Sequence, residues 1–227
     1  MGRCVDCNKK EGLFSKNDQY GLCKSCSSSI NGHIRYHGLI KFWLSLSKIE
    51  RRKCIENYDG VGIQSGGTSA GLIRGNLSST SQTSAALLDV LGSNLISKKE
   101  YALAEKILEE AEKQADNPID LHFCYNKQIE LTYKLREEPS YLNRCVFYCI
   151  KDIELYPVFS KAWDERFGGD AYSLRIPSFE RLAIIHEKQG QIEEAIKVCE
   201  AAIEYGLKDD TKGGFEGRLE KLKKKLK

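Results

Sequence analysis

The chain of 227 residues has no long run of apolar residues and no apolar segment close behind its first residues. A membrane-spanning helix needs about 20 consecutive apolar residues, and a secretory signal needs a shorter apolar stretch near its start. The N-terminal myristoylation pattern is also missing, because residue 6 is aspartate rather than serine or threonine. We therefore expect a cytoplasmic protein with no membrane partner. In a reducing cytosol its nine cysteines should bind metal or lie in the core rather than form disulfides.

The sequence also lacks the short motifs that mark common enzyme active sites. It contains no P-loop, no G-x-S-x-G, no H-E-x-x-H and no protein-kinase signature. Glycines are numerous between positions 60 and 75, but no Lys-Ser or Lys-Thr pair follows them in a G-x4-G frame. These absences favour a binding protein over an enzyme.

Charge is distributed unevenly along the chain. Residues 1–56 contain eleven Lys or Arg and five Asp or Glu, so this segment carries a net charge of +6. Because the whole chain carries +3, the remaining 171 residues sum to −3. The two parts therefore differ in electrostatic character, which indicates different binding partners.

Composition divides the chain into three segments. Residues 1–56 hold four closely spaced cysteines and then an aromatic, basic stretch; we call this segment the finger module. Residues 57–83 are predicted to be a flexible linker, because fourteen of the 24 residues from 60 to 83 are Gly, Ser or Thr and none is acidic. Residues 84–227 place Leu, Ala, Glu and Lys at helical spacing throughout. The predicted fold class is mainly α.

Residues 84–227 contain a repeated pair of helices. The segments LLDVLGSNLISKKEYALAEKILEEAEKQ and FERLAIIHEKQGQIEEAIKVCEAAIEYG place large and small apolar residues at the same offsets. The small residues allow two antiparallel helices to approach closely. This pattern resembles the tetratricopeptide repeat (TPR), whose unit of about 34 residues is a helix-turn-helix. A weaker copy lies between the two segments, and there Asp152 occupies a position where the family has a small residue.

The resemblance to TPR proteins implies a fold and a kind of partner. It implies three helix pairs, which is about the minimum for a stable stack. The last segment, GFEGRLEKLKKKLK, is predicted to be a polar helix that caps the array. Members of the family are scaffolds, so the resemblance implies a protein or peptide partner in the groove lined by the first helix of each pair.

Four of the nine cysteines stand close together at the start of the chain. Cys4 and Cys7 form one C-x-x-C pair, Cys23 and Cys26 form a second, and fifteen residues separate the pairs. This spacing is typical of a structural Zn2+ site, in which two pairs of thiolates surround one ion. We therefore predict one zinc per chain with no open coordination position. So short a segment buries little apolar area, and metal binding supplies much of its folding free energy.

The finger module also resembles known zinc fingers. The residues GLFSKNDQYGLC between the cysteine pairs predict strand, turn and strand, and a helix is predicted from about Lys24. This arrangement resembles a treble-clef finger. The stretch from YGLCKSC to INGHIRYHG is similar to the fingers of phage HNH-type endonucleases, which implies DNA or RNA as a partner. The chain departs from those fingers at position 26, where a cysteine replaces the histidine that is often found.

Two further features of the finger module leave alternatives open. His33 and His37 are four residues apart, so on a helix they would share one face. In a nuclease such a pair would bind a catalytic metal or activate water. However, no carboxylate or Asn accompanies them in a recognisable arrangement. The stretch LIKFWLSLSKIERRK predicts a basic amphipathic helix that either binds phosphates or only carries a solvated basic rim. Its apolar face would carry Leu39, Phe42, Trp43, Leu46 and Ile49.

The remaining cysteines are expected to be small core residues. They are Cys54, Cys124, Cys145, Cys149 and Cys199. The whole sequence is thus interpreted as a zinc-binding TPR adaptor, with a nucleic-acid-binding protein as the alternative and an HNH-like nuclease as a third hypothesis.

Overall fold

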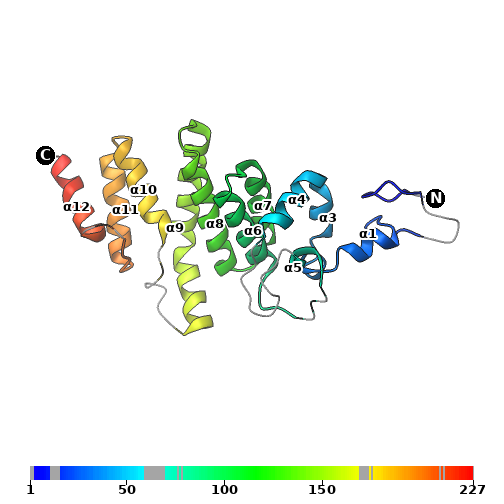
Figure 1. Ribbon diagram of the computed structural model, residues 1–227. Helices are drawn as coiled ribbons and strands as arrows, with labels where there is room; N and C mark the ends of the chain where they lie inside the picture. The colour runs from blue at the N-terminus through cyan, green and yellow to red at the C-terminus, as the bar shows by residue number, and fades with distance from the viewer. Residues whose placement is uncertain are drawn as a thin grey trace. The chain divides into compact units, whose positions relative to one another are not determined.

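The computed structural model describes residues 3–10, 16–58, 70–75, 77, 79–168, 174, 176–209, 211 and 213–226 (Figure 1). Within these residues every regular element is a helix, and β-structure is limited to an isolated antiparallel bridge between Arg3 and Lys10. The predicted mainly α class is confirmed. The chain divides into two compact units, Met1–Gln114 and Ala115–Lys227, here the N-terminal and C-terminal units. Among the described helices, none combines the length and hydropathy that a membrane span requires.

The N-terminal unit ends in a helix pair whose close approach depends on one small residue. The side chain of Thr83 accepts a hydrogen bond from the backbone N–H of Ala86 and so caps the first helix. At Gly92 an added Cβ would lie 2.5 Å from a methyl carbon of Leu108, so only glycine allows this spacing. The unit comprises α1 (Lys24–Ser29), α2 (His33–Tyr36), α3 (Ile40–Ser45), α4 (Lys48–Asn57), α5 (Ala70–Ile73), α6 (Ser84–Ser97) and α7 (Tyr101–Gln114).

The basic amphipathic stretch after residue 39 forms two helices rather than the one that we predicted. Ser47 and Glu50 form a capping box: the Ser47 hydroxyl accepts from the Glu50 N–H, and the Glu50 carboxylate accepts from the Ser47 N–H at 2.7 Å. This cap marks the start of α4, so the apolar periodicity of α3 does not continue into α4. Ile49 therefore leaves the apolar face and is 67% exposed, whereas Trp43 and Leu46 are buried.

The segment predicted as a linker, residues 57–83, lies partly outside the described residues, but its described part includes a packed helix. In α5 the carbonyl of Ile73 accepts hydrogen bonds from the N–H groups of Asn31 and Gly32 at 2.9 and 3.1 Å, and Leu72 is fully buried. Ion pairs join Lys53 to Glu100 at 2.6 Å and Glu50 to Lys106 at 2.5 Å. The finger module and the first helix pair therefore belong to one compact unit, Met1–Gln114.

We expect the substitution Gly32→Ala to release α5 from α2. An added Cβ at Gly32 would collide with the backbone of Gly71, Ile73 and Arg74, which cannot move aside as a flexible side chain does. The expected cost is roughly 1–3 kcal/mol. Hydrogen exchange should show faster exchange of the Asn31 amide in the variant. Unchanged exchange there would contradict the packing of α5.

The C-terminal unit contains the other two helix pairs and a final helix. Figure 1 shows these helices in chain order, each next to the one before it. Asn117 caps the first helix by accepting from the N–H groups of Ile119 and Asp120. In the final helix Phe215 and Leu222 are buried while Lys223 and Lys225 are exposed, as a capping helix requires. The elements are α8 (Pro118–Lys134), α9 (Pro139–Phe167), α10 (Pro177–Lys188), α11 (Ile192–Glu204) and α12 (Gly214–Lys225).

Helix α9 is longer than the repeat pattern indicates. It continues through Pro157 and spans 29 residues. The additional turns bury Phe159 completely, and the Trp163 ring lies 5.9 Å from the Phe159 ring. This burial outweighs the loss of the backbone hydrogen bond that proline cannot donate. The residues after Pro157 are therefore helical up to Phe167.

A buried polar pair explains why Asp152 departs from the repeat pattern. His122 Nδ1 lies 2.6 Å from an Asp152 carboxylate oxygen, and both side chains are buried. The imidazole also stacks on Phe159 with ring centroids 3.8 Å apart, and its Nε2 lies 2.9 Å from the Asn126 amide nitrogen. Asp152 thus joins α9 to α8 through a hydrogen bond where the repeat pattern has a small apolar contact.

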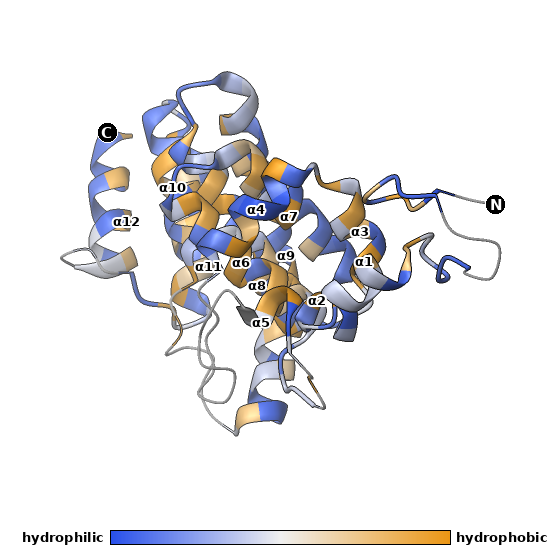
Figure 2. Cartoon of the chain, turned by 45° about the vertical axis from the view of Figure 1, so that its right-hand side comes forward, coloured by the Kyte–Doolittle hydropathy of each residue, from blue (hydrophilic) through white to orange (hydrophobic). Residues whose placement is uncertain are grey.

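Apolar faces hold the last two helix pairs together. Figure 2 shows both orange and blue residues along the helices of this unit, and the buried apolar residues of α10 and α11 belong to one core cluster that includes Phe179, Ala183 and Ala195. Gly190 has a φ of +74° in the turn between α10 and α11, a left-handed conformation that glycine adopts readily. The buried apolar residues of the C-terminal unit form two core clusters. Three of the five cysteines expected in the core belong to them: Cys145, Cys149 and Cys199.

Candidate metal centre

The four cysteines at the start of the chain form one cluster. The Sγ atoms of Cys4, Cys7, Cys23 and Cys26 all lie within 4.8 Å of one another. Cys4 and Cys23 are buried, Cys26 is half-buried and Cys7 is exposed. Within the described part of the chain, no other group of three or more His, Cys, Asp or Glu side chains is placed to share an ion.

A tight turn positions the first cysteine pair. The N–H of Asn8 donates to the carbonyl of Cys4 at 2.9 Å, and the N–H of Cys4 donates to the carbonyl of Lys9 at 3.0 Å. Asn8 adopts a φ of +60°, a left-handed conformation that asparagine tolerates better than most residues. Both thiols therefore lie on the same side of the turn.

A polar turn and the start of α1 position the second pair. The Asp18 carboxylate accepts from the N–H groups of Tyr20 and Leu22, and its other oxygen accepts from the Ser27 hydroxyl at 2.6 Å. Cys23 precedes α1 and Cys26 lies in its first turn. Residues 16–23 contain turns rather than the second strand that we predicted, because these side-chain bonds take up the backbone N–H groups. Residues 11–15, which include most of the predicted first strand, lie outside the described residues.

Burial, backbone N–H groups and the neighbouring thiols shift the pKa values of Cys4 and Cys26 in opposite directions. Burial opposes ionisation of Cys4, but the backbone N–H groups of Cys23, Cys7 and Asp6 lower the pKa of its thiol to about 6. Burial, followed by the neighbouring thiols of Cys7, Cys23 and Cys4, raises the pKa of Cys26 well above its usual value. A dication resolves this conflict, because coordinated thiols are bound as thiolates.

The dimensions of the cluster fit a tetrahedral metal ion. With metal–sulfur distances of about 2.3 Å, the sulfurs of a tetrahedral site lie about 3.8 Å apart. The Sγ atoms of Cys7 and Cys23 are 3.7 Å apart. Four protein ligands complete such a shell, so the cluster can hold an ion structurally but leaves no position for a substrate.

His33 and His37 come together outside the cluster. Their rings stack with centroids 5.8 Å apart and 8° between planes, and the ring of Tyr58 lies 6.2 Å from that of His33. His33 Nδ1 and His37 Nε2 are buried, and no described atom pairs with either. The described residues give the two histidines no carboxylate and no third ligand.

The histidine pair predicts a loss of stability in acid. Burial lowers the pKa of His33, and burial followed by the charge of His33 lowers the pKa of His37 from 6.5 to about 4. Below pH 6.5 the unfolded chain therefore binds more protons than the folded chain, so unfolding becomes easier as the pH falls towards 4. Because His37 is only half-buried, solvent screening reduces the effect, which is on the order of 1–3 kcal/mol.

Urea unfolding of the full chain at neutral pH and at about pH 5 tests this effect. Acid also protonates the cysteine ligands, so the comparison is between wild type and His37→Phe. The variant is expected to lose less stability on acidification. An equal loss in both proteins would contradict the assignment.

Three of the five acidic side chains of the finger module lie beside a cation, two within the module and one on α7. Asp6 pairs with Arg51 at 2.8 Å, Asp18 lies 4.0 Å from Arg35, and Glu50 pairs with Lys106. Eight lysines and arginines of the module are exposed and have no carboxylate partner among the described residues. They are Arg3, Lys9, Lys10, Lys16, Lys24, Lys41, Lys48 and Arg52.

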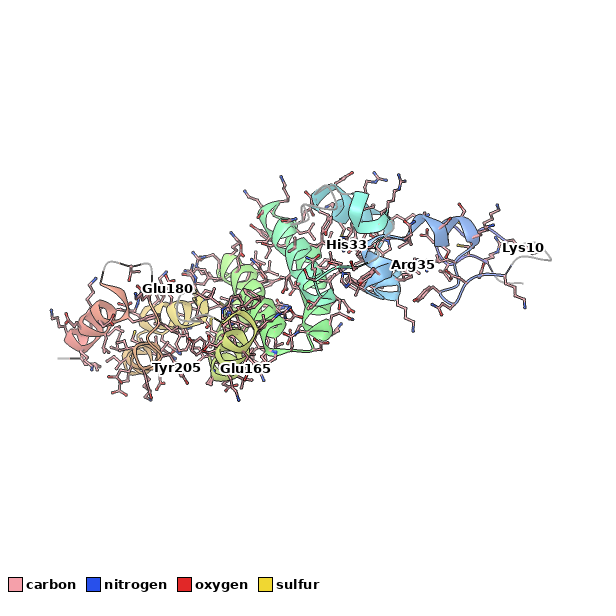
Figure 3. The ribbon with its side chains drawn as sticks, turned by 90° about the horizontal axis from the view of Figure 1, so that it is seen from below. Lys10, His33, Arg35, Glu165, Glu180 and Tyr205 are labelled. Carbon is pink, nitrogen blue, oxygen red and sulfur yellow. The ribbon has the colours of Figure 1, made fainter. Side chains whose placement is uncertain are left out.

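A hollow on the finger module gathers some of this positive charge. Its volume is about 600 Å3, and Lys16, Lys24 and Arg35 contribute to its lining together with one carboxylate, Asp18, and with Ser28 and Asn31. The Arg35 guanidinium donates to the carbonyls of Ile30 and Ser27, which holds it at the rim. Figure 3 shows Arg35 beside His33 and Lys10 at the far end of the module. The hollow is wide enough for a phosphate group.

A second hollow, the α9–α11 groove, lies in the C-terminal unit. Its volume is about 290 Å3, and it is formed by α9, α10 and α11. We expected a groove lined by the first helix of each pair, but this one is bordered by the second helices, α9 and α11. Sequence reasoning missed it, because apolar residues on α9 look like core residues until the structure shows which of them are exposed. Its lining is mainly apolar: Ile150, Ile153, Phe179, Leu182, Val198 and Ala201, with Glu154, His186, Glu194 and Lys197.

Together these features define a mainly helical protein with an N-terminal four-cysteine cluster that can bind a metal ion. An uncharacterized protein of Aquifex aeolicus (strain VF5) is 28% identical over 153 residues, which is 66% of this chain and 71% of that protein. No model of a known protein family matches the chain, and no solved structure matches it. That relative is described without a function, so a functional proposal depends on the geometry.

Proposed function

We propose that the protein is a zinc-binding, TPR-like adaptor that holds a protein partner on its helix pairs. The α9–α11 groove carries this proposal, because its floor is apolar and Ile150 at its edge is 42% exposed. Apolar grooves between helices accept the apolar side chains of peptides and helices. The helix pairs, the small residue at Gly92 and the capping helix α12 support a TPR-like array.

Zinc is the metal that best suits the four-cysteine cluster. Its d10 ion has no preference of its own for geometry and binds four thiolates tetrahedrally in structural sites. The bound ion would fix the positions of the two cysteine pairs relative to each other. Because Cys23 directly precedes α1, the ion would also fix the start of this helix. We propose one structural zinc per chain, and the treble-clef-like order of turn and helix supports it.

Site-specific photo-crosslinking in the native host tests the adaptor function. A benzophenone amino acid at Ile150 should give an adduct with a distinct protein, identifiable by mass spectrometry. The matched control carries the same amino acid at Lys134, which is exposed on α8 outside the groove. No adduct, or the same adducts at both positions, would contradict a groove partner.

The finger module supports a second function, the binding of DNA or RNA. The observation that favours it is the pairing of acids described above, which leaves unpaired cations on the surface and Lys16 and Lys24 at one hollow. Such cations bind phosphates and release counterions, so affinity falls steeply with salt. The similarity to phage endonuclease fingers supports the same partner.

Salt-dependent binding to a short DNA duplex tests this second function. Changing Lys16 and Lys24 to glutamine should reduce the slope of log K against log salt by about 2 if each contacts one phosphate. Lys208→Gln, an exposed position in the C-terminal unit, is the matched control. Absence of salt-dependent binding by the wild-type chain would rule the function out for duplex DNA.

A further inference from the structure

Helix α9 presents an apolar strip to solvent. Phe147 is 51% exposed and Val158 is 56% exposed. At 3.6 residues per turn, Phe147, Lys151, Glu154 and Val158 fall within about 60° of one another around the helix. The strip is about three turns, or about 16 Å, long. It adjoins the α9–α11 groove through Ile150 and Glu154.

The two charges on this strip are available for a partner. The Lys151 ammonium lies 5.8 Å from the ring centre of Phe147. Neither Lys151 nor Glu154 forms an ion pair with any described residue, and both are exposed. A partner helix that covers the strip must therefore bring an acid opposite Lys151 and a base opposite Glu154, or bury both charges at a cost.

The strip is complementary to an antiparallel copy of itself. A two-fold axis between residues 152 and 153 superposes each position on its counterpart in a second, antiparallel α9. Phe147 then lies opposite Val158 of the second copy, and Lys151 lies opposite its Glu154. Both pairs occur twice, because residue i meets j and j meets i in a two-fold interface. The half-buried Leu155 lies opposite Ile150 in the same register.

We propose that this face binds a second copy of the chain, with the two α9 helices antiparallel across a two-fold axis. The proposal goes beyond the adaptor function, since it assigns a second copy of the chain to the exposed strip that adjoins the α9–α11 groove. A different protein that binds this face must be complementary to it. Self-complementarity of the face is required only when the partner is a second copy of the chain. At the ends of the overlap, Arg144 approaches Lys161, whose charge is offset by Glu165 at 3.9 Å. The dimer would present two finger modules at once.

Sedimentation velocity of the zinc-loaded full chain over a wide concentration range tests the proposal. Wild type is expected to dimerise reversibly. Lys151→Glu and Glu154→Lys should each weaken the dimer about tenfold or more, because each places like charges opposite one another twice. The double variant K151E/E154K should recover wild-type affinity, since it restores both opposite pairs. Lys208→Glu and Glu204→Lys, exposed in the same unit, should leave the dimer unchanged.

The outcomes separate this proposal from the adaptor function. A wild-type chain that stays monomeric, or a double variant that fails to recover, overturns the α9 dimer. If the monomeric chain still forms an Ile150 crosslink to another protein, the adaptor function stands and the dimer alone is wrong. If the wild-type chain is monomeric and gives no crosslink, both fail. Circular dichroism of each variant shows that loss of the dimer is not loss of fold.

Discussion

Serine in place of Cys26 is expected to abolish metal binding and to unfold residues 3–10 and 16–29, while α8 to α12 remain folded. The zinc-free segment has few apolar residues to bury, and structural zinc contributes about 10–16 kcal/mol in finger peptides. Cys26 lies in the first turn of α1, so its loss removes the contact between this helix and the Cys4 turn. Amide NMR spectra of the full chain should show collapse of dispersion for these residues alone.

Cys199→Ser is the matched control for the metal centre. Cys199 is buried in the C-terminal unit and belongs to its apolar core, so its loss should reduce stability slightly and leave the metal content unchanged. A chelator added to wild type should reproduce the Cys26→Ser spectrum. A folded, unchanged finger module in the Cys26→Ser variant would refute a metal-dependent fold.

Alanine in place of His122 is expected to destabilise the C-terminal unit by about 3–5 kcal/mol, the usual cost of removing one partner of a buried pair. Asp152 is fully buried and would lose the imidazole that lies 2.6 Å away. The stacking of the imidazole on Phe159 is lost as well. Chemical unfolding followed by circular dichroism measures the change as a shift of the midpoint at constant slope.

A double variant distinguishes the buried pair from simple packing. His122→Phe with Asp152→Leu replaces both polar groups by apolar ones of similar size, so it should regain most of the stability that His122→Ala loses. Asp152→Leu alone should be strongly destabilising, because it leaves the buried imidazole without its acceptor. If all three variants unfold at the same denaturant concentration, the pair does not hold α8 against α9.

Local signals made the metal site and the helix pairs predictable. A C-x-x-C spacing brings two thiols together through the geometry of one turn, so the cluster of Cys4, Cys7, Cys23 and Cys26 follows from the sequence. The helix pairs follow from apolar residues spaced at 3.6 residues per turn, reinforced by repetition. The nature of the metal and the partners stay predictions.

Features that depend on distant contacts were not predictable. The docking of α5 depends on Gly32 meeting the backbone of Ile73, and Gly-rich composition gives no sign of that contact. Helix α9 passes Pro157 because Phe159 is buried beyond it, which tertiary packing alone decides. By contrast, the break between α3 and α4 was available as the capping-box pattern of Ser47 and Glu50.

The buried pair lies between these cases. Asp152 is recognisable in the sequence as a misfit in an apolar repeat position, but its partner His122 is 30 residues away. Only the packing of α8 on α9 reveals that the misfit is compensated. The exposed strip on α9 is similar, since Phe147 and Val158 look like core residues until the structure shows which face they occupy.

X-ray absorption at the zinc edge of the full-length protein tests the central claim most directly, because it reports both the metal and its ligands. We expect about one zinc per chain with four sulfur neighbours at about 2.3 Å. A chain purified without stoichiometric metal, or a zinc bound mainly by nitrogen and oxygen, would contradict a Cys4–Cys7–Cys23–Cys26 zinc centre.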